Sequence, residues 1–346
     1  MKRLLLIVFL LVPSLLSACS SKGPVTLTVI THDSFAASEA VISAFEQANN
    51  IKVVFLKSGD AGAVLNKVIL TRDAPLADVF YGVDNTFLSR ALDAGIYEAY
   101  DSPLLARIPA GFQLDPQNRL LPVDYGDICI NYDKAYFALH GLPVPVSLED
   151  LLKPGYKDLL VVENPATSSP GLAFLLATIK HFGPGGYLDF WRSLRTNGVV
   201  VVDGWETAYY TNFSASSGHG SQPLVVSYSS SPAAEVIYAS SPLTDAPTAS
   251  ILGPDACFRQ VEFVGILKGT GHLSLAKKFV DFMLSRQFQE DIPLQMFMVP
   301  VNTEADLPQE FIQYAQIAPQ PATLDPAEIA ANRDLWIAGW TETVLR

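Results

Sequence analysis

The N-terminal third of the chain alternates short apolar runs with amphipathic stretches. Residues 25–31 (VTLTVIT) are rich in β-branched side chains, which is typical of a buried strand. The same pattern recurs along this part of the chain, and it predicts strands at 51–56 and 77–82 and helices at 40–48, 64–69 and 85–94. A strand–helix repeat predicts a parallel sheet covered by helices, with ligands bound beyond the carboxyl ends of the strands.

A second series of strands and helices follows a proline-bounded segment at 103–122. We expect strands at 123–132, 159–163, 199–203, 224–228 and 258–267, and helices at 172–182, 205–213, 232–239, 275–284 and 326–345. The first and last of these strands are long enough to cross between two units.

The sequence therefore predicts an α/β protein of two lobes, each a mostly parallel sheet flanked by helices, joined by two crossing strands. Lobe I is expected at 25–123 and 248–298, and lobe II at 124–247 and 299–346. The cleft between such lobes is the natural place for a small ligand.

The first residues have the layout of an export signal. Lys2 and Arg3 precede an apolar run at 4–16, and the sequence Leu-Ser-Ala before Cys19 matches a bacterial lipobox. We predict a lipoprotein signal peptide at 1–18, a lipid on Cys19 and a tether at 19–24. The protein would then be exported and lipid-anchored, at the outer face of the cell membrane or in the periplasm. An ordinary signal with a chance cysteine is the alternative.

Composition narrows the possible partners. Of 346 residues, 49% are hydrophobic and 17% charged, which excludes a disordered chain. There are 23 Lys and Arg against 35 Asp and Glu, giving a net charge of −12, so a nucleic-acid partner is not expected. No CxxC pair or HExxH motif occurs, and we expect neither a metal nor a cofactor.

Two cysteines besides Cys19 fall near the predicted crossing strands. Export makes a disulfide between Cys129 and Cys257 permissible, and the two would lie close together on adjacent crossings. We favour two buried free thiols, with the disulfide as the alternative.

Serine-rich and aromatic loops follow several predicted strands. In Thr167-Ser168-Ser169-Pro170-Gly171, Ser169 suits the N-cap and Pro170 the first turn of a helix, whose free N–H groups could bind an anion or a polar ligand tail. Plain capping without a ligand is the alternative.

Trp205 and Tyr228 also stand at strand ends, where they could stack on a planar cation. Trp205 as a core anchor is the alternative. Asp33, Asp84 and Asp124 occupy similar positions and could pair with such a cation, although each alone is more often a cap or turn residue.

The same residues give less support to two other functions, a serine hydrolase and an iron-binding protein. A GxSxG elbow and a Walker A motif are absent, and no histidine stands in an evident order with a serine and an aspartate. A secreted lipoprotein serine hydrolase therefore remains only an alternative. Tyr209-Tyr210 could ligate ferric iron or another small cation, but no further ligand set is evident.

Several short motifs occur along the chain: 31–35 (THDSF), 77–79 (ADV) with 82–85 (GVDN), 122–126 (PVDYG), 164–172 (NPATSSPGL), 204–209 (GWETAY) and 227–233 (SYSSSPA), followed by 288–289 (FQ), 292–293 (IP) and 300–301 (PV). Taken together, these motifs are similar to those of the substrate-binding proteins of bacterial thiamine ABC importers. The resemblance implies the type II periplasmic-binding-protein fold and a receptor for thiamine or its phosphates that breaks no bond. It also implies a monomer that docks on an ABC permease driven by a separate ATPase.

By this resemblance, Trp205 and Tyr228 would be walls for the rings of thiamine, and Ser168 with its neighbours would hold the hydroxyethyl or phosphate end. The candidate ligand-binding residues are Asp33, Ser34, Asp84, Asp124, Tyr125, Thr167, Ser168, Ser169, Trp205, Tyr228, Ser229, Ser230 and Phe297.

The chain also departs from these relatives. Phe297 stands where they carry tryptophan, and Ala234 and His32 stand where they carry tyrosine, while Tyr238 lies one helical turn beyond Ala234.

Overall fold

The computed structural model describes residues 24–215 and 220–346. The predicted signal peptide, Cys19 and most of the tether lie outside these residues, as does part of the serine- and glycine-rich loop at 214–221. No helix in the described ranges is both long and apolar enough to cross a membrane.

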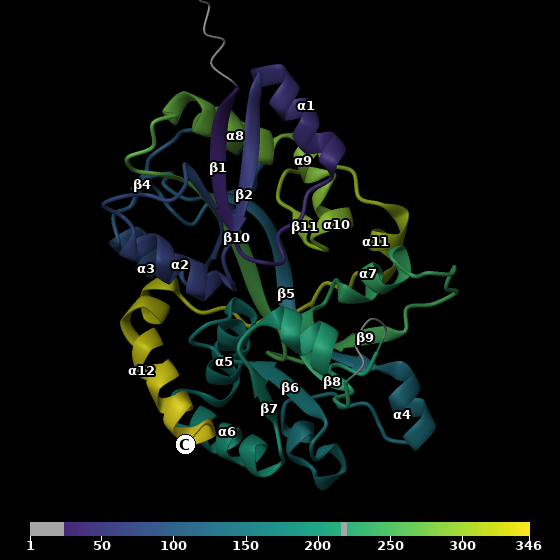
Figure 1. The fold of residues 1–346 in the computed structure, drawn as a ribbon. Coiled ribbons are helices and arrows are strands. Elements are labelled where there is room, and N and C mark those ends of the chain that lie inside the picture. The colour runs from purple at the N-terminus through teal and green to yellow at the C-terminus, as the bar shows by residue number, and fades with distance from the viewer. Residues whose placement is uncertain (1–23, 216–219) are drawn as a thin grey trace, which may run out of the picture.

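Three parallel strands form the sheet of lobe I. Strand β1 (Val25–Thr31) lies between β2 (Ile51–Lys57) and β3 (Val79–Asp84), and it pairs in parallel with both. Helices α1 (Glu39–Asn49), α2 (Ala61–Leu70), α3 (Leu88–Asp93) and α8 (Leu273–Leu284) accompany them in the upper half of Figure 1. This is the predicted order of elements, with boundaries within three residues.

Lobe II repeats this arrangement with a second set of parallel strands. Strand β6 (Leu160–Glu163) lies between β7 (Val200–Val202) and β8 (Leu224–Tyr228). Its helices are α5 (Ser169–Phe182), α6 (Tyr187–Thr196) and α7 (Ser231–Ile237). The last helix, α12 (Pro326–Val344), contacts both α6 of lobe II and α3 of lobe I, along one side of the molecule (Figure 1).

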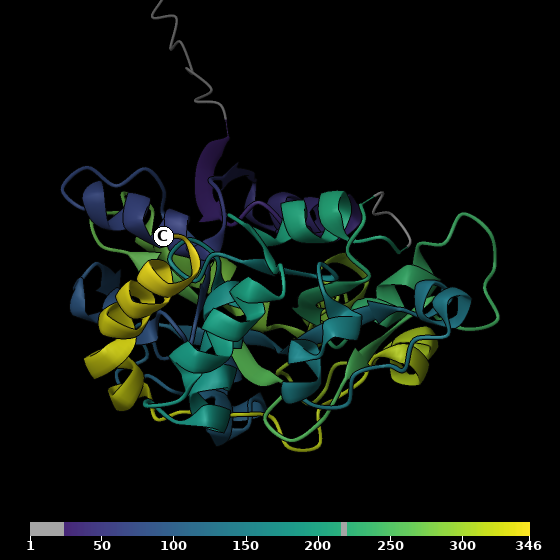
Figure 2. The same cartoon turned by 90° about the horizontal axis from the view of Figure 1, so that it is seen from below.

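Two long antiparallel strands connect the lobes, as predicted. Strand β5 (Leu121–Asp133) pairs with β10 (Phe258–Leu267), β10 pairs with β3, and β5 pairs with β8. Eleven strands in the described ranges thus share one hydrogen-bonded sheet. Figure 2 shows the same molecule from below.

The two cysteines on these crossings form a disulfide, which corrects our expectation of free thiols. Cys129 on β5 and Cys257 just before β10 have Cα atoms 4.3 Å apart and are bonded. Antiparallel register accounts for it, because Phe258 pairs with Ile128 and so brings the neighbouring cysteines together. The alternative weighed from the sequence is therefore the correct one.

Other differences concern short elements. Strand β9 (Thr248–Ile251) pairs with the lobe II end of β5, in a stretch for which no strand was predicted. Helix α6 was not expected, and the helix predicted at 205–213 contains a π-helical turn at Thr207–Asn212. The cap of α5 is Ser168 rather than Ser169. The lobe boundaries remain a prediction, and the pairing of β9 favours assigning 248–251 to lobe II.

The remaining elements are short. They are the strands β4 (Tyr97–Glu98) and β11 (Val299–Pro300), the helices α4 (Lys134–His140), α9 (Arg286–Gln289), α10 (Ile292–Gln295) and α11 (Gln309–Tyr314), and the 3₁₀ turns Pro103–Arg107, Ala110–Phe112, Glu149–Leu152 and Pro154–Tyr156.

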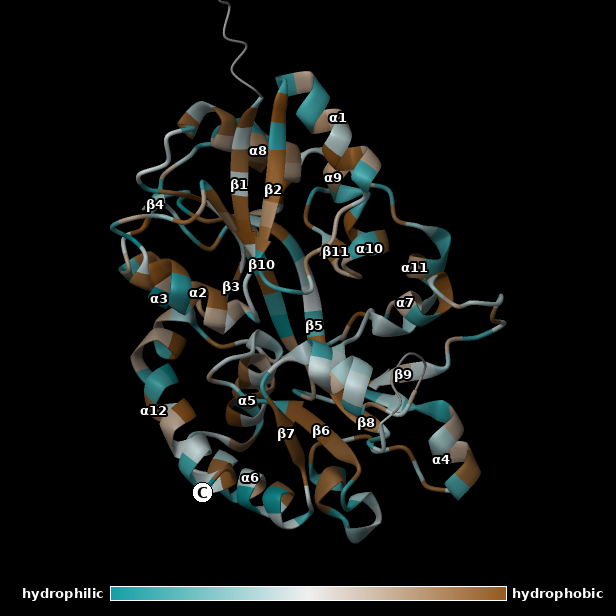
Figure 3. Cartoon of the chain, viewed as in Figure 1, coloured by the Kyte–Doolittle hydropathy of each residue, from teal (hydrophilic) through white to brown (hydrophobic). Residues whose placement is uncertain are grey.

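The largest apolar cluster runs from lobe I into lobe II, and a second cluster lies within lobe I. In lobe I, Phe279 of α8 packs against Phe45 of α1, and in lobe II the indoles of Trp191 and Trp340 meet at 5.5 Å. Hydrophobic residues concentrate on the strands, whereas the outer helices carry polar residues (Figure 3). The lobes are thus joined by shared apolar packing as well as by the crossing strands.

Candidate functional site

A cavity of about 320 Å³ lies between the lobes, where the loops after several strands meet. Its walls come from the ends of β1, β2 and β8, the N-terminus of α5, the segment after β7 and the segment between α10 and β11. The lining residues are His32, Asp33, Ser34, Phe35, Ala36, Lys57, Asp60, Ala61, Ser169, Pro170, Trp205, Glu206, Tyr210, Tyr228, Ser231, Tyr238, Glu262, Gln295, Met296, Phe297 and Met298. This volume suits a small organic ligand.

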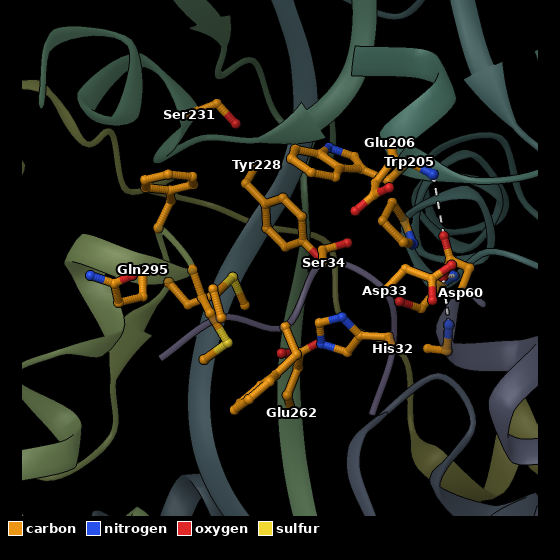
Figure 4. A pocket seen from close by; sticks show the side chains of 18 of the residues that line it. His32, Asp33, Ser34, Asp60, Trp205, Glu206, Tyr228, Ser231, Glu262 and Gln295 are labelled. Atoms are coloured by element: carbon orange, nitrogen blue, oxygen red, sulfur yellow. Dashed lines mark hydrogen bonds and ion pairs between the residues drawn. The ribbon is translucent and has the colours of Figure 1, made fainter. Parts of the chain in front are cut away.

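Two aromatic rings of lobe II form one wall of the cavity. The rings of Trp205 and Tyr228 stand edge to face with centroids 6.1 Å apart (Figure 4). The indole Nε1 of Trp205 donates to Ser227 Oγ at 2.9 Å, and Tyr209 stacks on the indole at 5.1 Å. Trp205 is therefore both a core anchor and a cavity wall, which combines the two interpretations of the sequence.

Gly126 of β5 makes room for this wall. A Cβ atom built on Gly126 would lie 2.9 Å from Cδ1 of Tyr228 and 3.0 Å from Sδ of Met298. Any side chain at this position would push one of these two lining residues away, so glycine is required by the close approach.

Phe297 and the methionines beside it form the facing wall from lobe I. Phe297 has a φ of 60°, a left-handed conformation that is rare for a bulky residue. Such strained residues gather at ligand clamps. Tyr238 of lobe II meets Phe297 edge to face at 5.4 Å and donates its hydroxyl proton to the carbonyl of Leu294. These contacts connect the two lobes at one end of the cavity.

A buried acidic cluster forms the floor of the cavity, on the crossing strands. Glu262 of β10 and Asp124 of β5 are paired in register, and both accept from the hydroxyl of Tyr81, at 2.7 and 2.6 Å. His32 Nε2 lies 3.7 Å from Glu262 Oε1. Only Glu262 and His32 of these four line the cavity.

The pKa shifts in this cluster show which of its groups carries a charge toward the cavity. Burial and the neighbouring Glu262 carboxylate raise the pKa of Asp124 well above its usual range, so Asp124 is the harder of the two acids to ionise. Burial opposes ionisation of Glu262, but the facing His32 and the hydrogen bonds with Tyr81 and Asp124 together outweigh it and lower the Glu262 pKa. Burial likewise disfavours the charged imidazole of His32, yet Glu262 raises its pKa. The ionised carboxylate therefore faces the cavity.

His32 reaches this position because Gly82 has no side chain. Gly82 of β3 has a φ of 107°, and a Cβ atom there would lie 2.3 Å from Cδ2 of His32. The glycine thus serves both the backbone conformation and the packing of the imidazole.

Asp60 connects the lobes at the other end of the cavity. It caps α2 by accepting from the N–H of Ala61 at 2.7 Å, and it also accepts from Ser169 N at 3.3 Å and Trp205 N at 3.2 Å (Figure 4). Burial raises the Asp60 pKa, and the backbone donors, Trp205 first, oppose that shift.

The excess of acidic side chains in the cavity favours a cationic ligand. Four lining residues are acidic, namely Asp33, Asp60, Glu206 and Glu262, while Lys57 is the one lysine or arginine among the described lining residues. Carboxylates next to two aromatic walls form a site that attracts a flat cation.

The cavity brings together six of the thirteen candidate residues. These are Asp33, Ser34, Ser169, Trp205, Tyr228 and Phe297. Asp33 also ties two loops of lobe I together, because its Oδ1 accepts from Gly59 N at 2.8 Å.

Four other candidates lie close to the cavity but do not line it. Asp124 belongs to the buried cluster, and Asp84 accepts from Thr86 N at 2.7 Å as a turn residue, with a pKa that burial raises to about 6. Thr167 donates to the carbonyl of Asp203 at 2.7 Å, and the hydroxyl of Ser168 is buried at the cap of α5. For Asp84, the turn interpretation is the one that fits.

Tyr125, Ser229 and Ser230 line a different, smaller cavity of about 160 Å³ between β5 and α11. Tyr125 stacks on Phe112 at 4.7 Å, which turns it away from the cleft. Side chains alternate between the two faces of a strand, so Asp124 and Tyr125 could not both face the ligand.

Three residues that line the cavity, Glu262, Asp60 and His32, were not among the candidates named from the sequence, although the sequence contains features that could have indicated them. Glu262 is a charged residue inside an otherwise apolar strand, a combination that usually marks a paired or functional group. Asp60 ends a small polar loop directly after a predicted strand. His32 was noted only as a departure from the resembling family.

The described residues do not favour the iron alternative. They hold no group of three or more His, Cys, Asp or Glu side chains arranged to hold a metal ion. The hydroxyl of Tyr209 donates to Glu235 at 2.5 Å, and the ring of Tyr210 stands at 83° to that of Tyr209. The two tyrosines thus take separate structural positions.

Comparison with known proteins agrees with this architecture. Residues 74–318 match the family described as bacterial extracellular solute-binding protein. The thiamine-binding periplasmic protein of Salmonella typhimurium is 32% identical over 340 residues, covering 96% of this chain and 97% of the relative.

Solved structures extend the likeness to the fold. A periplasmic thiamin binding protein superposes with a TM-score of 0.82 at 29% identity, over 94% of this chain and 98% of its own. Iron-bound HitA from Pseudomonas aeruginosa shares the fold alone, with a TM-score of 0.74 at 20% identity over 92% of this chain and 99% of its own. The two lobes on crossing strands are the type II periplasmic-binding-protein fold. The chain belongs to the bacterial extracellular solute-binding protein family.

Proposed function

We propose that this protein is an extracytoplasmic receptor that binds thiamine in the cleft between its lobes and delivers it to an ABC importer. The observation that carries the proposal is the wall of Trp205 and Tyr228 above the Glu262 carboxylate, facing Phe297 across one cavity. Thiamine combines two flat heteroaromatic rings with one permanent positive charge. The aromatic side chains of the cavity would stack on the rings of thiamine, and the Glu262 carboxylate would pair with its positive charge.

Relatives support the same ligand. Proteins at about 30% identity over nearly the whole chain are thiamine-binding periplasmic proteins. By the resemblance, the family carries tryptophan at position 297 and tyrosine at positions 234 and 32. Of the residues found here, Phe297 and His32 line the cavity and Ala234 does not. Phe297 still offers a ring to stack on, and Tyr238 supplies a second ring beside it.

The proposal also covers the sites named from the sequence. The residues we assign to the ligand are Asp33, Ser34, Ser169, Trp205, Tyr228 and Phe297, together with His32 and Glu262. We further propose export, a lipid on Cys19 as the membrane anchor, and a monomeric receptor that meets the permease with its ligand bound. Binding without bond cleavage is the whole of its chemistry.

A fluorescence titration tests the proposal. The chain has four tryptophans, and only Trp205 lines the cavity among the described residues. We expect thiamine to quench emission at a 1:1 ratio, with a Kd of about 1 μM or lower. The quench should disappear in Trp205→Phe and persist in Trp336→Phe, a buried tryptophan elsewhere in lobe II that serves as the matched control.

The same protein samples can be used to test whether the protein hydrolyses its ligand. Thiamine monophosphate recovered intact after long incubation agrees with a receptor, whereas its conversion would favour the hydrolase alternative. No quench and no calorimetric heat at protein concentrations of about 50 μM would exclude thiamine as the ligand.

A further inference from the structure

The smaller cavity of about 160 Å³ between β5 and α11, which we call the rear cavity, has mostly apolar walls. Its apolar side chains are those of Val299, Leu307, Phe311, Ile312, Ala315 and Ile317. Ile312 and Ile317 are more than half exposed, so the cavity can be reached from solvent. An apolar cavity of about 150 Å³ accommodates a molecule the size of benzene.

The rear cavity and the cleft share two segments of backbone as walls. In residues 228–231, the first and last line the cleft, and the two between them line the rear cavity. Met298 likewise lines the cleft, whereas Val299, the next residue, lines the rear cavity. Gly126 lies between the two cavities: it lines the rear one, and a Cβ atom on it would come within 2.9 Å of Tyr228 and 3.0 Å of Met298.

One polar group in the rear cavity lacks a partner. The carboxylate of Asp127 is held by Arg259, whose Nε and one terminal nitrogen donate to it at 2.7 and 2.9 Å. The side-chain carbonyl of Gln316 accepts from Ser250 N at 2.8 Å. Ser230 is only 3% exposed, and its Oγ is the one buried side-chain oxygen among the described lining residues without a hydrogen-bond partner. An unpaired buried hydroxyl is unfavourable, so it marks a point where a bound molecule would form a hydrogen bond.

Volume, lining and this hydroxyl together define the chemistry of an occupant. A lone water is a poor one, because buried waters typically make about three hydrogen bonds and most of these walls are apolar. A charged molecule would lose its hydration without a free partner of opposite charge, since Asp127 is already paired with Arg259. One aromatic ring suits the volume, and a hydroxyl or amino group on that ring would pair with Ser230.

We propose that the rear cavity is a second binding site, which takes a neutral molecule of one aromatic ring with one hydroxyl or amino group, and that its occupation strengthens binding in the cleft. An occupant would support the shared segments from behind, and those segments carry Tyr228 and Met298 on their cleft side. Coupling of this kind is reciprocal, so the ligand of the cleft would strengthen binding in the rear cavity equally. The coupling rests on the proposed function, whereas the second site does not.

Calorimetry with phenol tests the second site. We expect phenol to bind with a Kd of about 1 mM or lower. Ser230→Ala should weaken phenol at least about threefold and leave toluene, which has no hydroxyl, unchanged. Ser231→Ala is the matched control, because this neighbouring serine lines the cleft instead, and it should leave the phenol affinity unchanged. No binding at phenol concentrations of about 10 mM, or the same affinity in Ser230→Ala as in the wild-type protein, would overturn the proposal.

A second pair of variants locates the phenol, since the aromatic walls of the cleft are another place where it could bind. Ala315→Leu fills part of the rear cavity and should weaken phenol at least about tenfold. Ala331→Leu, at an exposed position on α12, is its control and should not. Thermal melting establishes that each variant is folded, and the serine variants decide the matter if Ala315→Leu does not fold. Phenol that thiamine displaces, or that binds less tightly to Trp205→Ala, would place phenol in the cleft and overturn the proposal.

Thiamine titrations with and without saturating phenol test the coupling. We expect phenol to lower the Kd of thiamine at least about threefold in the wild-type protein and in Ala331→Leu, but not in Ala315→Leu. Independent affinities would refute the coupling. If phenol binds and thiamine does not, the proposed function fails and the second site stands. If thiamine binds and phenol does not, the second site fails and the receptor remains.

Discussion

The pairing of His32 with Glu262 predicts that thiamine binding strengthens as pH rises. The imidazole and carboxylate lie 3.7 Å apart on the floor of the cavity. Below the pKa of His32, which Glu262 raises above 6.5 against the effect of burial, the pair is neutral as a unit. Above that pKa, the Glu262 carboxylate is left uncompensated and can pair with the thiazolium charge.

Other charged groups near His32 also influence its pKa. Asp60 and Lys57 act on it from the loops of lobe I with opposite signs, and Tyr81 of β3 contacts its ring at 5.6 Å. Burial raises the pKa of Asp124 well above its usual range, so Glu262 is the dominant charged partner of His32.

Coulomb's law gives the size of the effect. A unit charge about 5 Å from the ligand is worth about 3 kcal/mol at an effective dielectric constant near 20, and partial solvation reduces this to about 1–2 kcal/mol. The Kd for thiamine should therefore fall about 5- to 30-fold between about pH 6 and about pH 8.5. Calorimetry across this range measures it directly.

Two variants isolate the cause. His32→Phe should bind thiamine with a Kd that is nearly flat over this range, and Glu262→Gln should be both flat and weaker at high pH. A wild-type Kd independent of pH, or a slope that survives in His32→Phe, would refute the reasoning. Since the folded pKa of His32 is raised, the stability it contributes is present below about pH 6.5 and lost as pH rises through that pKa.

Three further predictions follow from the cavity, the crossings and a buried acid. Trp205→Ala should weaken thiamine binding by at least about 1 kcal/mol in a calorimetric titration, and unchanged affinity would remove the indole from the site. Replacing Cys129 and Cys257 together by alanine should lower the free energy of unfolding by about 2–5 kcal/mol in urea, because the bond closes a long loop. Thiol titration of the denatured, non-reduced protein should find neither cysteine reactive. Burial raises the pKa of Glu163 well above 4.5, so the wild-type protein should lose thermal stability as pH rises above about 5. Glu163→Gln should lose less, and parallel pH profiles would contradict this.

Local patterning explains why so much of the fold could be predicted. Strands such as β1 and β8 are short, apolar and bounded by polar loops, so their limits match the prediction at Val25–Thr31 and Leu224–Tyr228. The crossing strands stood out by their length. Helix α6 was missed because its apolar residues follow a Gly-Pro-Gly-Gly turn and are interrupted by charged ones.

The site was harder to predict because it depends on register and on contacts between the lobes. Trp205 and Tyr228 stand at strand ends in one lobe, so the sequence could place them together. Whether Asp124 or Glu262 faces the ligand depends on the pairing of β5 with β10, which no local pattern specifies. The bonds of Asp60 to the opposite lobe likewise join residues more than 100 positions apart.

The disulfide shows the same limit. Cys129 and Cys257 are separated by 128 residues, and only the antiparallel crossing brings them together. The predicted export signal made a disulfide permissible, and the structure shows that the two cysteines are bonded.

A crystal structure of the protein grown with thiamine tests the central claim most directly. The account predicts one thiamine between the lobes, with a ring within about 4 Å of the indole of Trp205, the usual contact distance of stacked groups. Its thiazolium should lie on the Glu262 side of the cavity and its rings between Tyr228 and Phe297. Thiamine bound elsewhere, or a saturated crystal with other density in the cleft, would contradict the account.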